Sequence, residues 1–196
     1  MKTKGRSRRS FLAASVTGLN GAWVAANYHG ILAAQEYVGQ AAKSGQLPRL
    51  SFFTDQQAAE IEAMTAQIIP TDETPGAREA RCLYFIDRAL TTFARGSQPA
   101  YVQGLQELQA KTQQLYPGAG KFSALASGQQ IQLLTEIEKT PFFNMVRTHT
   151  VIGFLTRPEH GGNHDKVGWN LIGYDDSLNH KPPFGYYDAQ VQEKLP

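Results

Sequence analysis

The chain has 196 residues, of which 41% are hydrophobic and 18% are charged, enough for one compact domain with appendages. Its net charge of +2 comes from residues 2–9, which hold five basic and no acidic residues; removing these five from the 19 basic residues leaves 14 against 17 acidic, or −3. No basic stripe interleaved with aromatics follows, so we exclude nucleic-acid binding.

Residues 1–34 have the pattern of a twin-arginine export signal. Arg8 and Arg9 are followed after one residue by Phe11 and Leu12, the arrangement that the export receptor reads. The soft apolar stretch behind them is too short and too polar for a membrane span. We therefore expect the twin-arginine translocase to carry the folded chain to the periplasm. An ordinary amphipathic helix with a basic start is the alternative, and cleavage of the segment stays open.

Helical patterns fill residues 50–155 and predict an all-α bundle of about five helices. Thr54 and Gln57 form a capping-box pattern at the first start, and Pro70 closes that helix. Ser127 is expected to cap the fourth helix, and the fifth is apolar on most sides and therefore central. The predicted helices cover residues 55–69, 77–93, 99–115, 127–137 and 142–154.

Residues 156–196 are predicted to form a long irregular arm that docks on this domain or on a partner. The segment is rich in Gly, Pro, Asn, Asp and aromatics and has little helical periodicity. Long segments without their own helices tend to be functional or partner-bound, and aromatics are enriched at interfaces. Its aromatics are Trp169, Tyr174, Phe184, Tyr186 and Tyr187.

The single cysteine, Cys82, excludes an internal disulfide, a cysteine-based zinc site and a haem-attachment motif. It is either buried and inert or a candidate for an intersubunit disulfide. The chain also lacks a dinucleotide fingerprint and an iron–sulfur cysteine set. Because the twin-arginine route usually serves cofactor-bearing cargo, we expect no cofactor in this chain and one in a partner.

Three histidines are candidate metal ligands: His149, His160 and His164, with Asp165 beside the last. The two glycines between His160 and His164 place them in a loop, so helical ligand spacing does not apply. Structuring of the loop through hydrogen bonds is the reading we prefer, and we predict no metal site.

Four carboxylates and one glycine pair are the remaining candidates for a catalytic or an anion-binding site. The carboxylates Asp72, Glu73, Glu79 and Asp87 could act in acid–base catalysis, but carboxylates near helix starts mostly cap them. Gly161-Gly162-Asn163 is a conceivable anion nest or simply a turn. No nucleophile, base and oxyanion stabiliser assemble, so we predict no catalytic residue.

Several motifs follow one another along the chain. They are Ile68 to Ala77, Phe85-Ile86-Asp87, Pro141-Phe142-Phe143, Arg147 to Thr150, Gly153-Phe154-Leu155, Pro158, Gly161-Gly162-Asn163, Gly168-Trp169 and Ile172-Gly173-Tyr174. Together they resemble the signature of the gluconate 2-dehydrogenase small-subunit family (subunit 3, or gamma), which the twin-arginine leader also fits.

The resemblance implies a non-catalytic small subunit. Such subunits accompany an FAD-containing large subunit that oxidises a sugar, polyol or sugar acid, often together with a multihaem cytochrome c. The large subunit commonly lacks its own signal, so the small subunit escorts it through export and stabilises it. For this chain the resemblance implies a periplasmic location at the inner membrane, with flavin and catalytic residues in the partner and haem c in a third subunit.

We predict a partner interface of aromatic anchors: Phe142, Phe143, His149, Trp169, Tyr174, Phe184, Tyr186 and Tyr187. Phe142 and Phe143 head the helix that supports the motif loop, and His149 is expected to hydrogen-bond the glycine-rich loop. Two alternatives remain: an interaction module for another exported redox enzyme, and a stand-alone metal-dependent periplasmic enzyme. The substrate stays open.

Overall fold

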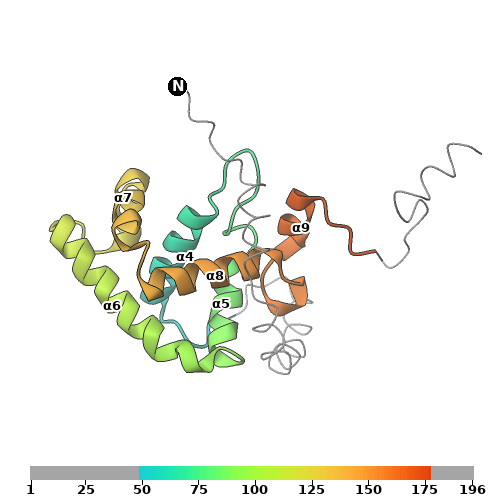
Figure 1. Cartoon of the computed structure of the whole chain (residues 1–196), viewed down its shortest axis with the longest axis horizontal. Helices are drawn as coiled ribbons and strands as arrows, with labels where there is room; N and C mark the ends of the chain where they lie inside the picture. The colour runs from blue at the N-terminus through green and yellow to red at the C-terminus, as the bar shows by residue number, and fades with distance from the viewer. Residues whose placement is uncertain (1–48, 178–196) are drawn as a thin grey trace, which may run out of the picture.

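A computed structural model of the chain describes residues 49–177, which form six α-helices and four short 3-10 turns without any strand. This confirms the all-α prediction. Figure 1 shows α8 crossing the middle of the fold, with α6 and α7 at one end and α9 at the other. The predictions for the export signal (Arg8, Arg9, Phe11, Leu12) and for Phe184, Tyr186 and Tyr187 lie outside the described residues.

The first described helix, α4 (Asp55–Ile68), begins at the predicted capping box. The Thr54 hydroxyl accepts the Gln57 N–H at 3.3 Å, and the Gln57 side chain accepts the Thr54 N–H at 3.0 Å. Both bonds satisfy amides that a helix start leaves without a partner. The helix ends just before Pro70, as expected from the restricted backbone ahead of a proline.

The second predicted helix is shorter than its sequence pattern suggested: α5 spans Cys82–Thr91 rather than residues 77–93. The Ala77 N–H donates to the Ile69 carbonyl at 2.8 Å, and the Ala77 carbonyl accepts the Cys82 N–H at 3.0 Å. Residues 77–81 therefore form a turn, and Arg81 takes a left-handed conformation with φ 55° before the helix starts.

Helices α6 (Gln98–Leu115), α7 (Ser127–Ile137) and α8 (Pro141–Leu155) follow the prediction closely. The cap predicted for Ser127 is wrong, since this residue is the first of α7 and its hydroxyl contacts the Gln67 side chain. The Gln129 side chain accepts the Ala126 N–H there instead, at 3.1 Å. Thr140 caps α8 by accepting the Phe143 N–H at 3.2 Å.

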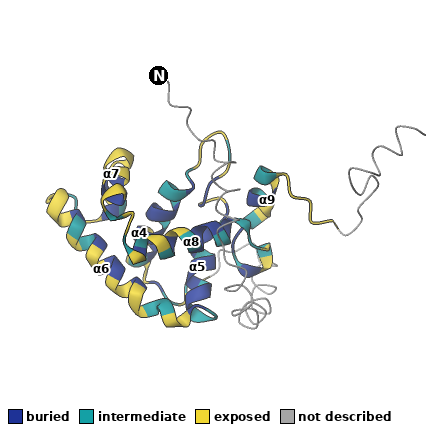
Figure 2. Ribbon diagram, viewed as in Figure 1, coloured by how far each residue is buried: buried dark blue, intermediate teal, exposed yellow. Residues whose placement is uncertain are grey.

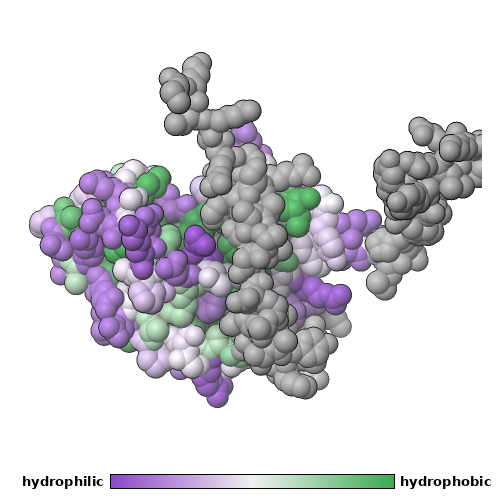
Figure 3. Space-filling model, viewed as in Figure 1, coloured by the Kyte–Doolittle hydropathy of each residue, from purple (hydrophilic) through white to green (hydrophobic). Residues whose placement is uncertain are grey.

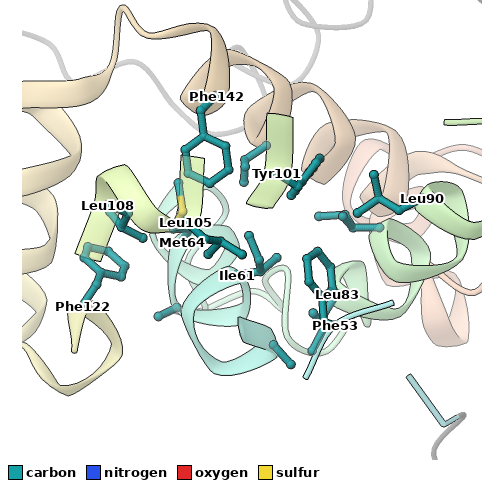
Figure 4. Close-up of a cluster of buried hydrophobic side chains, with 14 of the residues drawn as sticks. Phe53, Ile61, Met64, Leu83, Leu90, Tyr101, Leu105, Leu108, Phe122 and Phe142 are labelled. Carbon is teal, nitrogen blue, oxygen red and sulfur yellow. The ribbon is translucent and has the colours of Figure 1, made fainter. Parts of the chain in front are cut away.

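The central place predicted for the fifth helix is confirmed, because α8 contacts α4, α5, α6 and α9. Figure 2 shows the buried residues on the facing sides of these helices, with the exposed faces of α6 and α7 outward. Figure 4 shows the main core between them. Its labelled members are Phe53, Ile61, Met64, Leu83, Leu90, Tyr101, Leu105, Leu108, Phe122 and Phe142.

The described part of the predicted arm, residues 156–177, is not irregular throughout. It contains the short helix α9 (Val167–Ile172) after two 3-10 turns, and α9 contacts α8. A six-residue helix could not be predicted from the sequence, because it is too short to show a periodic pattern of apolar residues. Within residues 49–177, no helix combines the length and apolarity needed to cross a membrane.

Candidate functional site

Two stretches that are far apart in the sequence meet in one place, which we call the motif region: residues 68–82 and residues 150–174. A second hydrophobic cluster joins them, with Ile69, Ala77, Ala80 and Cys82 from the first stretch and Phe154 from the second. The His164 N–H also donates to the Ala80 carbonyl at 3.2 Å. Most of the motifs singled out in the sequence therefore build a single structural unit.

Glycines in the motif region allow its backbones to touch. A Cβ atom at Gly162 would overlap the Gly153 carbonyl, and one at Gly168 would overlap the Phe154 carbonyl. A Cβ at Gly76 would lie 2.5 Å from the Ile69 carbonyl oxygen. Gly162 is buried against α8 in this way, so the Gly161-Gly162-Asn163 turn serves close packing and is not an open anion nest.

Asn163 holds the loop of the motif region to α9. Its side chain is fully buried; its Nδ2 donates to the Thr156 carbonyl and its Oδ1 accepts the Gly168 N–H, both at 2.8 Å. Its φ of 46° lies in the left-handed region, which asparagine tolerates better than most residues. The sequence pointed to Asn163 as part of a conceivable anion nest and of a family motif, but not to this bonding role; an amide directly after two glycines was the available signal for it.

Backbone strain is concentrated in the motif region. The four described residues other than glycine with positive φ are Arg81, Asn163, Asp165 and Lys166, and all belong to it. Such conformations cost energy and gather at sites where function needs a fixed backbone. Together with the packed glycines, this makes the motif region the candidate functional site.

Two aromatic side chains of the motif region pack together, one buried and the other exposed. Trp169 is 8% exposed, and its indole N–H donates to the Leu155 carbonyl at 2.8 Å. Tyr174 packs edge-on against it, with ring centroids 5.0 Å apart, and is 54% exposed. Trp169 thus anchors α9 within this chain, whereas Tyr174 offers an aromatic surface, consistent with the interface predicted for it.

The sequence suggested that His149 hydrogen-bonds the glycine-rich loop, but in the structure its partner lies elsewhere. Its Nδ1 lies 2.9 Å from the Tyr101 hydroxyl inside the core, and Phe142 packs edge-on against the same tyrosine ring. Burial lowers the pKa of His149 to about 4 and raises the pKa of Tyr101. Phe142 and His149 therefore serve the core and have little surface for a partner; Phe143 is half-buried against it.

The histidines that were weighed as metal ligands lie in different surroundings. His160 is buried, its Nδ1 has no hydrogen-bond partner in the described chain, and burial lowers its pKa. His164 is half-exposed, with its Nε2 3.5 Å from an Asp165 oxygen. No group of three or more metal-ligating side chains occurs between residues 49 and 177.

Three of the four candidate acid–base carboxylates hold turns and segments. Asp72 accepts the Thr74 N–H at 2.9 Å, and Glu79 accepts the Gly76 N–H at 2.8 Å and the Thr71 hydroxyl at 2.7 Å. The Thr71 bond lowers the pKa of Glu79. Asp87 is buried and accepts hydrogen bonds from three main-chain N–H groups. The fourth candidate, Glu73, is exposed.

Cys82 is fully buried at the start of α5, and its thiol lies 3.5 Å from the Thr150 carbonyl as a donor. Burial also raises the pKa of the thiol. Of the two readings offered by the sequence, the fold supports the buried, inert cysteine. A disulfide to another chain would require the core of the motif region to open.

We accordingly expect Cys82 to react with a thiol reagent only after unfolding. The folded chain should show no fast reaction, and denaturant should release one reactive thiol. A Ser127→Cys variant supplies the control, because Ser127 is exposed and its replacement should react at once. Fast labelling of the unmodified folded chain, or a shifted band on a non-reducing gel, would contradict the burial.

Stability should fall as the pH drops from 6.5 towards 4, because His149 is held neutral in the core. Its folded pKa, about 4, lies below the unfolded value of 6.5, so protons bind the unfolded chain more readily and the stabilising effect is complete only above pH 6.5. The difference corresponds to about 3 kcal/mol. Chemical denaturation at a series of pH values measures it.

A His149→Gln variant should flatten much of this pH dependence. His160, whose pKa is also lowered, contributes in the same direction, so some slope should remain. His164→Gln is the matched control on the half-exposed histidine and should leave the slope as it is. An unchanged slope in His149→Gln would mean that His149 does not titrate between folded and unfolded states.

The family model described as gluconate 2-dehydrogenase subunit 3 matches residues 55–176, from the start of α4 to just beyond α9. The matched segment thus contains the whole motif region and most of the main core. No curated protein and no solved structure gives a significant match to the chain.

Proposed function

The chain belongs to the gluconate 2-dehydrogenase subunit 3 family, which implies a subunit of such a dehydrogenase complex, and we propose that it is the non-catalytic small subunit. In this proposal a flavin-containing large subunit oxidises a sugar, polyol or sugar acid. The small subunit escorts it through twin-arginine export to the periplasm and stabilises it there. A multihaem cytochrome c subunit accepts the electrons, and FAD and haem lie outside this chain.

The observation that carries the proposal is the construction of the motif region. Its glycines allow close backbone packing, and the buried Asn163 side chain hydrogen-bonds two segments of the main chain. One aromatic side chain, Tyr174, stays exposed. Its strained backbone is held by hydrogen bonds and close packing within this chain. Such a rigid surface is suited to presenting fixed contacts to another protein.

The chemistry of the buried polar side chains supports a non-catalytic role. Asp87 accepts main-chain amides, Glu60 accepts the Ser123 hydroxyl at 2.5 Å, and His149 pairs with Tyr101. A general base needs a pKa near the working pH, whereas burial places the pKa of His149 at about 4. These groups are engaged in holding helices and segments together.

Co-purification tests the proposal. The full chain, tagged at its C-terminus and expressed with its native neighbours, is purified from periplasm and membrane extracts. We expect a stoichiometric protein with flavin absorbance, which can then be assayed with sugars, polyols and sugar acids; a haem Soret band would reveal the third subunit. A colourless, monomeric chain would overturn the proposal.

The export role has its own variant pair. Arg8→Lys together with Arg9→Lys should remove both this chain and the flavoprotein from the periplasm, because the receptor reads the arginine pair. Arg6→Lys makes the same chemical change outside the pair and should leave export intact. Normal periplasmic flavoprotein in the double variant would separate the partner's export from this chain.

A further inference from the structure

A groove of about 500 Å³ lies between α4 and α6, away from the α9 end of the fold. Its rim carries five glutamines, and Leu105 and the buried Glu60 are among its other lining residues. Figure 3 shows the hydrophilic surface over α6 and α7 at the left of the molecule. The lining residues are Thr54, Gln56, Gln57, Glu60, Val102, Leu105, Gln106, Gln109, Ala110 and Gln113.

The groove has almost no charge. Glu60 is its one ionisable lining residue, and the Ser123 hydroxyl and N–H already bond its carboxylate. An ordinary exposed helix face carries lysines and glutamates, whereas the centre of a protein interface is depleted of charged residues. Val102, which is 39% exposed, adds an apolar contact to the same stripe of α6.

Three amide side chains of the groove are available to a ligand. Gln57 is used in the α4 cap, and Gln109 donates to the Gly120 carbonyl at 2.6 Å. Gln56, Gln106 and Gln113 form no hydrogen bond with another described residue. Each amide presents both donors and an acceptor, the set that matches the N–H and C=O of a main chain.

The shape of the groove favours an extended chain over a compact ligand. Its α6 side runs from Val102 to Gln113, which is about 16 Å at the rise of a helix. An extended chain covers that length with about five residues. A small-molecule site would instead enclose most of its ligand, whereas this groove is open to solvent.

We propose that this groove binds an extended, uncharged segment of the flavin-containing large subunit, whose main chain pairs with Gln56, Gln106 and Gln113. The inference rests on the proposed function and adds a second contact to it, separate from the motif region. Main-chain pairing would supply affinity, and the stripe containing Val102 would favour an apolar side chain in the segment.

A charge-insertion variant tests the groove within the full complex. Gln106→Glu with Gln113→Glu places two carboxylates on exposed positions of the lining, where a bound uncharged segment would have to bury them. We expect roughly tenfold weaker association of the large subunit, measured by dilution of the purified complex, with an unchanged melting temperature of the free chain. Equal affinity would overturn the groove as a contact.

The matched control is Ala100→Glu with Gln114→Glu. Both positions are exposed on α6 but outside the lining, so the same added charge should leave association within about twofold of the unmodified chain. If the unmodified chain retains no flavoprotein, the proposed function itself falls. If it retains one and the groove variant does so equally, only the groove is excluded.

A cross-link identifies the occupant. Gln106→Cys can be labelled selectively with a benzophenone maleimide, because the one native cysteine, Cys82, is fully buried. Irradiation of the complex should join position 106 to the large subunit, and the same label at Gln114→Cys should not. A cross-link to residues 178–196 of this chain, or to no protein at all, would overturn the assignment.

Discussion

Gly168→Ala is expected to destabilise the chain by about 3 kcal/mol or more, because the added methyl group has no space. Its Cβ would overlap the backbone carbonyl of Phe154, and a backbone atom cannot move aside as a flexible side chain can. The change would push α9 away from α8 and break the bond between the Gly168 N–H and Asn163. Thermal or chemical denaturation of the purified chain measures the loss.

Gly128→Ala provides the control for this substitution. Gly128 lies in the first turn of α7, and a Cβ there meets nothing within 4 Å. Since alanine is the better helix former, this variant should be neutral or more stable by up to about 1 kcal/mol. If Gly168→Ala behaved in the same way, α9 would not pack against α8 as closely as the structure shows.

Asp87→Ala is expected to cost about 4 kcal/mol, because it removes the acceptor of three main-chain hydrogen bonds at once. One carboxylate oxygen accepts the Ser51 N–H at 2.7 Å, and the other accepts the N–H groups of Phe52 and Phe53 at 3.0 and 2.9 Å. Loss of these bonds should release residues 51–53 from α5. Limited proteolysis should then cut near these residues before the bundle unfolds.

Two further variants isolate the contribution of charge and geometry at this position. Asp87→Asn keeps the shape but turns an amide N–H towards one of the bound main-chain N–H groups, so its cost should lie between that of Asp87→Ala and zero. Asp55→Asn makes the same change on an exposed carboxylate in the first turn of α4 and should cost at most about 1 kcal/mol. Similar losses at Asp87 and Asp55 would contradict the role of Asp87 as an anchor.

The structure bears differently on three predictions made from the sequence: the export signal, the aromatic tail and the intersubunit disulfide. The first two fall on residues 1–48 and 178–196 and stay predictions. The disulfide is at odds with the buried position of Cys82. Nothing in its spacing could have decided this, because burial depends on α8 and on the 68–82 turn, which close over the thiol from distant parts of the chain.

Local signals in the sequence determined most of the helix limits, the all-α class and the family. The capping box of Thr54 and Gln57 and the prolines at 70, 99 and 141 act through atoms within a few residues, so their effect is readable from the order of residues alone. The motifs that carried the family resemblance are also short and local, and the family match confirms it.

Only the tertiary structure decided what the polar and small side chains of those motifs do. Asp87 anchors a segment 34 to 36 residues away, and His149 pairs with Tyr101, 48 residues away, instead of the neighbouring loop. The helix α9 likewise depends on a close contact with the distant backbone of α8. Such partners are chosen by which surfaces pack together, and a single sequence carries no local pattern for a contact that forms only when the helices have assembled.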